Sequence, residues 1–191
     1  MLIDFRELFP RYNIKPKGVL HVGANIGEEA PIYLELGIKR QIWIEADPEI
    51  YQKLKQNISN NHEASAFNYC AGDEEGKEVV FHISNNGSQS SSVLELGTHL
   101  LEHPDVHYVK EIPMKTRRLD ILFYDGLLPT ANLGEFDFFN CDTQGFDLNV
   151  IKGMGVLLHQ FKWLNIESNK TEVYKKGALV GELEEYILKF P

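Results

Sequence analysis

Short apolar runs alternate with longer segments of helical spacing along most of the chain. Strands are expected where apolar residues run together between turn residues, at 18–24, 40–47, 64–72, 136–142 and 161–168. Helices are expected where the apolar spacing is helical, at 4–12, 27–37, 48–59, 117–127 and 146–160. This alternation predicts an α/β fold, with a mostly parallel sheet that carries helices on both faces and binds ligands at the carboxyl ends of its strands.

The middle of the chain departs from this alternation. Residues 77–84 have strand spacing, residues 85–92 (NNGSQSSS) form a polar loop, and residues 93–116 are irregular until an extended end. Two interpretations of the polar loop stay open: a lid that closes over a substrate with Gly87 as its hinge, or a simple hairpin connection.

The composition indicates one globular domain. A chain of 191 residues with 43% hydrophobic content can bury a single core. We therefore assign one domain over 1–191, with a helical lead-in at 1–15 and a loop-rich substrate or lid region at 84–118.

Charge and hydropathy argue against two kinds of partner. The net charge of −9 disfavours nucleic acid, because phosphate backbones are bound by clustered Lys and Arg. No apolar run approaches the roughly 20 residues that span a bilayer, and the first residues lack the basic start and long apolar stretch of a signal peptide. We expect a cytoplasmic protein without a membrane span, in which Cys70 and Cys141 are buried free thiols.

The first predicted strand ends in a turn that contains Gly23 and Gly27. A strand, glycine turn and helix of this kind point unpaired backbone N–H groups toward a ligand. A dinucleotide fingerprint needs a second glycine where this turn has Asn25, and the following Glu28 and Glu29 would repel a phosphate. The turn therefore favours a cationic or zwitterionic ligand.

Glu45 ends the second predicted strand, where an acidic side chain can accept hydrogen bonds from both hydroxyls of a ribose. The alternative is that Glu45 caps the neighbouring helix together with Asp47. A ribose without a pyrophosphate fits S-adenosyl-L-methionine, whose amino acid tail suits the glycine turn and whose sulfonium tolerates nearby carboxylates.

Several segments, taken in this order, resemble the FkbM-type S-adenosylmethionine-dependent methyltransferases: VLHVGANIGEE, IWIEADPEIYQKLKQNI, NYCAGDEEGKEVVFHIS, NGSQSSSVLELG, RRLDIL and FDFFNCDTQGFDLNVIKGMGVLL. The resemblance covers nearly the whole chain. It implies a Rossmann-like class I methyltransferase fold and the transfer of a methyl group, usually to a hydroxyl of a sugar or natural product.

The resemblance also implies the residues of the cofactor site. Those expected around the methionine part are Gly23, Ala24, Asn25 and Gly27. Glu45 is expected at the ribose, and the turn that contains Asn68, Cys70 and Ala71 at the adenine. Asp142 is expected beside the donor methyl group, and the remaining cofactor contacts are expected from His21, Ala46 and Gln144.

The chain departs from the family pattern at three places. His21 stands where the first motif often carries Asp, and Asp147 stands where Glu is common. Family members usually continue past ELEEYILKF into a final strand pair, so we expect this C-terminal pair to be missing and one edge of the sheet to be exposed.

Methyl transfer to a hydroxyl needs an aligned acceptor oxygen and a group that takes its proton. Asp142 is the first candidate base, although it could instead bind the ammonium of the cofactor or cap the next helix. Glu167 ends the last predicted strand and is the second candidate, with a solvated strand end as the alternative.

A metal is not expected. Three histidines, His99, His103 and His107, recur every fourth residue, which would align metal ligands on a continuous helix. Pro104 interrupts such a helix, so scattered surface histidines are the interpretation we adopt.

The sequence therefore predicts an S-adenosylmethionine-dependent O-methyltransferase that acts on a sugar, glycan or similar small hydroxylated molecule. Two alternatives stay open: a non-catalytic module that binds the nucleoside, and a nicotinamide-dependent oxidoreductase. The acceptor and the oligomeric state are not indicated.

Overall fold

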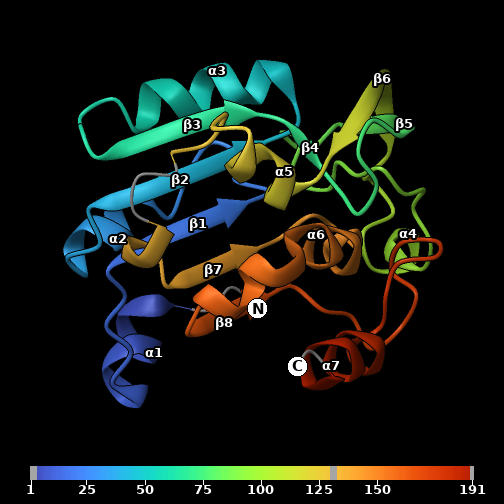
Figure 1. The fold of residues 1–191 in the computed structure, drawn as a ribbon. Coiled ribbons are helices and arrows are strands. Elements are labelled where there is room, and N and C mark those ends of the chain that lie inside the picture. The colour runs from blue at the N-terminus through green and yellow to red at the C-terminus, as the bar shows by residue number, and fades with distance from the viewer. Residues whose placement is uncertain (1–3, 130–132, 190–191) are drawn as a thin grey trace.

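The computed structural model describes residues 4–129 and 133–189, and its centre is a parallel sheet of five strands (Figure 1). The strand order is β3-β2-β1-β7-β8, and each neighbouring pair is parallel. The strands are β1 (Gly18–Val22), β2 (Arg40–Glu45), β3 (Ala64–Asn68), β7 (Phe138–Cys141) and β8 (Trp163–Ile166). The predicted α/β fold with a parallel sheet is confirmed.

Helices cover both faces of this sheet. Successive side chains of a strand point to opposite faces, so the apolar side chains form two core clusters, one under each layer of helices. One core cluster joins β1 residues such as Val19 to the first three helices, and the other joins Leu20 to the later ones. The first group is α1 (Phe5–Tyr12), α2 (Ala30–Glu35) and α3 (Pro48–Asn57). The second group is α5 (Leu119–Tyr124), α6 (Asp147–Met154), the 3-10 helix η2 (Gly155–Gln160) and α7 (Val180–Lys189).

Local sequence sets two of the helix ends near the sheet. Asp47 caps α3, since its Oδ1 accepts the backbone N–H groups of Glu49 and Ile50, and Pro48 takes the first helical position. Gly37 follows the end of α2 with a φ of 80°, a left-handed conformation that glycine adopts without strain.

A second, smaller sheet has the order β4-β6-β5, from β4 (Cys70–Ala71), β5 (Glu78–Ser84) and β6 (Tyr108–Arg117). The predicted single strand at 64–72 is therefore wrong: it breaks at Tyr69, because the chain leaves the main sheet there to pair with β6. Residues 93–116, which were expected to be irregular until an extended end, hold the short helix α4 (His99–Glu102) and then most of β6, which is that extended end.

In the residues that the structure describes, β8 forms one edge of the main sheet, and the expected loss of a strand pair stays a prediction. A 3-10 turn, η1 (Leu133–Glu135), precedes β7, and β8 is the last strand in the part of the chain that the structure describes. Within those same residues, β8 pairs with β7 alone. None of the helices described is both long enough and apolar enough to cross a bilayer; the cytoplasmic location stays a prediction.

Candidate functional site

The turn after β1 is shaped by its two glycines. Gly23 has a φ of 77°, and a Cβ there would lie 1.7 Å from the backbone oxygen of Asp142. Gly27 has a φ of 78°, and a Cβ there would lie 2.7 Å from a methyl carbon of Leu54. Glycine at position 23 therefore lets the turn approach the loop after β7 closely, and glycine at position 27 lets it approach α3.

The backbone donors of this turn are already used within the protein. The N–H groups of Gly23 and Ala24 both donate to the carbonyl of Ile44. The N–H of Asn25 donates to the side chain of Glu45, and the N–H of Ile26 donates to the side chain of Asn25. The N–H of Gly27 donates to the carbonyl of Ala24. The expectation of unpaired N–H groups is thus wrong for residues 23–27. A phosphate would find no free donor among them, which agrees with the preference for a different ligand.

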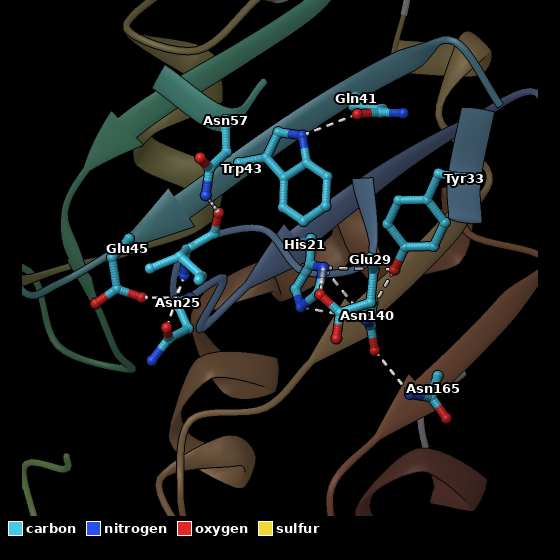
Figure 2. A network of polar contacts seen from close by, with 11 residues as sticks. His21, Asn25, Glu29, Tyr33, Gln41, Trp43, Glu45, Asn57, Asn140 and Asn165 are labelled. Atoms are coloured by element: carbon cyan, nitrogen blue, oxygen red, sulfur yellow. Dashed lines mark hydrogen bonds and ion pairs between the residues drawn. The ribbon is translucent and has the colours of Figure 1, made fainter. Parts of the chain in front are cut away.

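Glu45 ties the end of β2 to this turn. Its Oε2 accepts the N–H of Asn25 at 2.8 Å (Figure 2). Its Oε1 accepts the N–H of Asp47 at 2.7 Å. Burial raises the pKa of Glu45 to about 7, and the backbone N–H groups oppose this rise. Since Asp47 caps α3, Glu45 is not the helix cap that was considered. Each of its oxygens retains a lone pair that could accept from a ribose.

The predicted adenine residues lie next to Glu45. The amide of Asn68 donates to the carbonyls of Glu45 and Ala46, at 2.7 and 2.8 Å. Cys70 and Ala71 are buried in β4, and both cysteines of the chain are free thiols, as predicted. Burial, with a smaller contribution from the charge of Glu45, raises the pKa of Cys70 to about 12, so this thiol stays neutral.

Asp142, Gln144 and Glu167 meet at the carboxyl ends of β7 and β8. The amide nitrogen of Gln144 lies 2.5 Å from Oδ1 of Asp142 and 3.1 Å from Oε2 of Glu167. Burial and the charge of Asp142 raise the pKa of Glu167 well above its usual range. Glu167 is therefore a partly buried group coupled to a second carboxyl rather than a solvated strand end.

Asp147 shapes the loop between β7 and α6. Its two oxygens accept the N–H groups of Thr143 and Gly145, at 2.9 and 3.2 Å. It is buried, and burial raises its pKa to about 7. Aspartate in place of the more common Glu thus still fixes the loop that presents Gln144.

His21 lies in a buried polar layer between the sheet and α2 (Figure 2). Its ring stacks on Trp43 with centroids 4.8 Å apart, and its nitrogens lie within 3.4 Å of Tyr33 and Asn140. Burial lowers its pKa to about 4, so the ring is neutral, and Asp142 affects it as a nearby charge. The structure thus gives His21 core contacts, and its predicted contact with the cofactor stays a prediction.

The polar loop at 85–92, here called the serine loop, crosses the ends of three strands. The carbonyl of Gly87 accepts from the Asn25 side chain, and Ser88 Oγ donates to Asp47 at 2.9 Å. Ser92 Oγ donates to the backbone oxygen of Gln144 at 2.8 Å. A loop so bonded is more than a hairpin connection.

Strained backbone gathers at the same place. Asn25, Ser88 and Gln144 all have positive φ, at 45°, 67° and 54°. Left-handed conformations of this kind cost non-glycine residues about 1–2 kcal/mol each and persist where the surroundings hold them. Here each residue bonds to another loop of the site, which supports the assignment of the carboxyl edge as the functional site.

Tyr174 belongs to the site although the sequence does not point to it, because it follows β8 in no recognisable motif. It is 2% exposed, and its hydroxyl donates to Oε1 of Gln144 at 2.5 Å. Its ring lies 5.6 Å from that of His99, whose Nε2 is 3.1 Å from Ser90 Oγ. The one sequence signal for Tyr174 is its position a few residues after the strand that leads to Glu167.

The three spaced histidines do not form one helical face. Helix α4 ends at Glu102, before Pro104, and His107 lies beyond it beside β6. No group of three or more His, Cys, Asp or Glu side chains in the described part of the chain is arranged to hold a metal ion.

The chemistry of the site fits S-adenosylmethionine. Glu45, Asp142 and Glu167 accept hydrogen bonds from backbone and side-chain amides, and no ion pair within residues 4–129 and 133–189 joins them to Lys or Arg. A site with uncompensated carboxyl groups and few free donors suits a ligand with hydroxyl and ammonium donors and a sulfonium charge.

Comparison with known families identifies the type of domain. The family model described as a methyltransferase FkbM domain matches residues 21–190. The chain belongs to the FkbM methyltransferase family. Among curated proteins, no significant match is found. FkbM methyltransferases use S-adenosylmethionine, so this is the cofactor of the domain, and its five-stranded parallel sheet is consistent with a Rossmann-like methyltransferase fold.

Family membership tests the predictions made from the sequence. It confirms the resemblance and the cofactor, and it favours methyl transfer over a nicotinamide-dependent oxidoreductase. The individual cofactor contacts and the acceptor of this FkbM methyltransferase are matters for proposal.

Proposed function

We propose that this FkbM methyltransferase transfers a methyl group to a hydroxyl oxygen of a sugar, glycan or similar small hydroxylated molecule. The observation that carries the proposal is the pair of carboxyl groups, Asp142 and Glu167, held together by Gln144 at the ends of adjacent strands. A hydroxyl becomes a good nucleophile when its proton has a nearby acceptor, and this pair offers one.

The proposal gives the two carboxyl groups different roles. When bound, S-adenosylmethionine supplies an electrophilic methyl group on a positively charged sulfur. Asp142, whose backbone N–H bonds to β1 at Val22, holds the ammonium group beside the glycine turn. Glu167 takes the proton of the acceptor hydroxyl, and a nearby positive charge favours the ionised form that can do so.

The polar surroundings of the pair support a hydroxylated acceptor. Ser90, Ser92, His99 and Tyr174 all lie within the hydrogen-bonded layer that leads to Gln144. Hydroxyl, imidazole and phenol groups can recognise an acceptor with several hydroxyls, and a site that uses them rejects analogues without those hydroxyls strongly.

The test is transfer of label from S-adenosylmethionine carrying a radioactive methyl group to a panel of sugars, glycans and lysate fractions. We expect label in a methyl ether, which survives mild base, and no such label with Glu167→Gln at the same protein concentration. Label released by mild base would indicate a carboxyl acceptor and overturn O-methylation. Cofactor binding without label in any fraction would favour the non-catalytic binding module.

A further inference from the structure

Gln144 is held in a position that its own backbone does not favour. It adopts a φ of 54°, and the next residue, Gly145, has a φ of 90°. A Cβ at Gly145 would lie 2.9 Å from Cβ of Tyr174, so the loop after β7 packs tightly on the segment after β8. This packing places the Gln144 side chain between the ends of the two strands.

Every polar group of the Gln144 side chain is engaged. Its NH2 group donates to Asp142 and Glu167, and its Oε1 accepts from Tyr174. The backbone oxygen of Gln144 accepts from Ser92 as well. A tyrosine hydroxyl that donates to Oε1 leaves the two N–H bonds of the amide pointing at the two carboxyl groups, which fixes the orientation of the amide.

Tyr174 is itself rigidly placed. Its backbone bridges to Leu96, and the next residue, Lys175, donates its N–H to the carbonyl of Glu95. Burial raises the pKa of Tyr174, so its hydroxyl keeps the proton that it donates. A hydrogen bond with the Ser90 side chain joins Tyr174 to the serine loop.

The groups that face Glu167 make this orientation matter. Asp142 and Asp147 approach from the loop between β7 and α6, and Tyr174 approaches from the segment after β8. Two adjacent carboxyl groups do not readily ionise together. Donors that bind both oxygens lower the cost of the negative charge, whereas an amide oxygen turned toward them would raise it.

We propose that Gln144 and Tyr174 are positioning residues: the Tyr174 hydroxyl orients the Gln144 amide, and the amide holds the Asp142 and Glu167 carboxyl groups together and eases their ionisation. The inference rests on the proposed function, because the role of this pair in methyl transfer is proposed there. Neither residue needs to touch the acceptor for this role.

The test is a pH titration by NMR of protein labelled with 13C at its side-chain carboxyl groups, with neither cofactor nor acceptor present. The signal of Glu167 is identified by its loss in Glu167→Gln. We expect Gln144→Met to move the titration of Glu167 upward by about one pH unit, the size of a lost charge-assisted hydrogen bond. Tyr174→Phe should move it in the same direction by less.

Tyr124→Phe is the matched control, because Tyr124 is 69% exposed on α5 and its hydroxyl lies outside this network. It should leave the titration unchanged. A wild-type titration of Glu167 in folded Gln144→Met would overturn the proposal, and one in folded Tyr174→Phe would overturn the part played by Tyr174. If Tyr174→Phe does not fold, Gln144→Met decides.

The outcome is separable from that of the proposed function. Shifted titrations in a protein that methylates nothing would uphold the positioning role and contradict O-methylation. Ether formation with unshifted titrations would uphold O-methylation and contradict the positioning role.

Discussion

Glu45 and Glu167 are both acidic residues at the carboxyl ends of parallel strands, and burial raises the pKa of each. They differ in what surrounds the carboxyl group. Glu45 accepts backbone N–H groups from Asn25 and Asp47, which favour its charged form. Glu167 faces the carboxyl of Asp142, which favours the neutral form, and the one side-chain amide that it shares with Asp142 opposes this only in part.

One edge of a sheet can thus hold two kinds of acid. Backbone donors fix Glu45 as a hydrogen-bond acceptor, which suits the binding of donor groups such as ribose hydroxyls. A carboxyl that keeps a proton until its surroundings change suits proton transfer, which is the role that we propose for Glu167.

The largest expected effect is on turnover. Glu167→Gln should lower the turnover rate by roughly 10²–10⁴, the usual contribution of a positioned proton acceptor, with cofactor affinity close to that of the wild type. Asp142→Asn should instead weaken cofactor binding, because a charged hydrogen bond to the ammonium is lost, and largely preserve turnover at saturating cofactor. Methyl transfer kinetics and calorimetry of both variants measure the two quantities.

The opposite pattern would exchange the two roles. Unchanged turnover and affinity in both variants would move the catalytic centre away from the ends of β7 and β8.

A smaller effect is expected on the free energy of unfolding. Glu45 and His21 are both buried, and burial shifts their pKa values in opposite directions. The pKa of Glu45 rises from 4.5 to about 7, so the unfolded chain releases this proton first and stability is lost as pH rises from 4.5 through 7. The pKa of His21 falls from 6.5 to about 4, so stability is lost as pH falls from 6.5 through 4. Each contribution is about 3 kcal/mol at most.

Urea unfolding between pH 4 and 8 checks this pair. Glu45→Gln should reduce the loss of stability toward pH 7, and His21→Gln should reduce the loss of stability toward pH 4. The control His62→Gln, at an exposed position, should change neither loss. If the free energy of unfolding varies with pH in the same way in His21→Gln and His62→Gln, the pKa of His21 is not lowered in the folded protein.

The part of the site built from local sequence could be predicted. The glycine turn, the strand ends at Glu45, Asp142 and Glu167, and the cap at Asp47 depend on residues close in the chain and on a regular pattern. The strands of the main sheet could be predicted for the same reason. The break at Tyr69 could not be predicted, because it depends on pairing with β6.

The remainder depends on contacts between distant segments. Ser92 and Gln144 are 52 positions apart, and Tyr174 and Gln144 are 30 apart. Neither contact has a periodic signal. The use of the turn N–H groups within the protein also escaped prediction, because it depends on where Ile44 and Glu45 place their oxygens.

The cofactor site is tested by calorimetry with S-adenosylhomocysteine on the wild type, Glu45→Ala and the control Glu184→Ala, whose side chain is on the exposed surface of α7. Circular dichroism establishes that each variant is folded. We expect Glu45→Ala to weaken binding tenfold or more, since charge-assisted hydrogen bonds are each worth roughly 1.5–3 kcal/mol, and Glu184→Ala to bind as the wild type does. Wild-type affinity in folded Glu45→Ala, or tighter binding of NAD than of S-adenosylhomocysteine by the wild type, would overturn the proposed cofactor site.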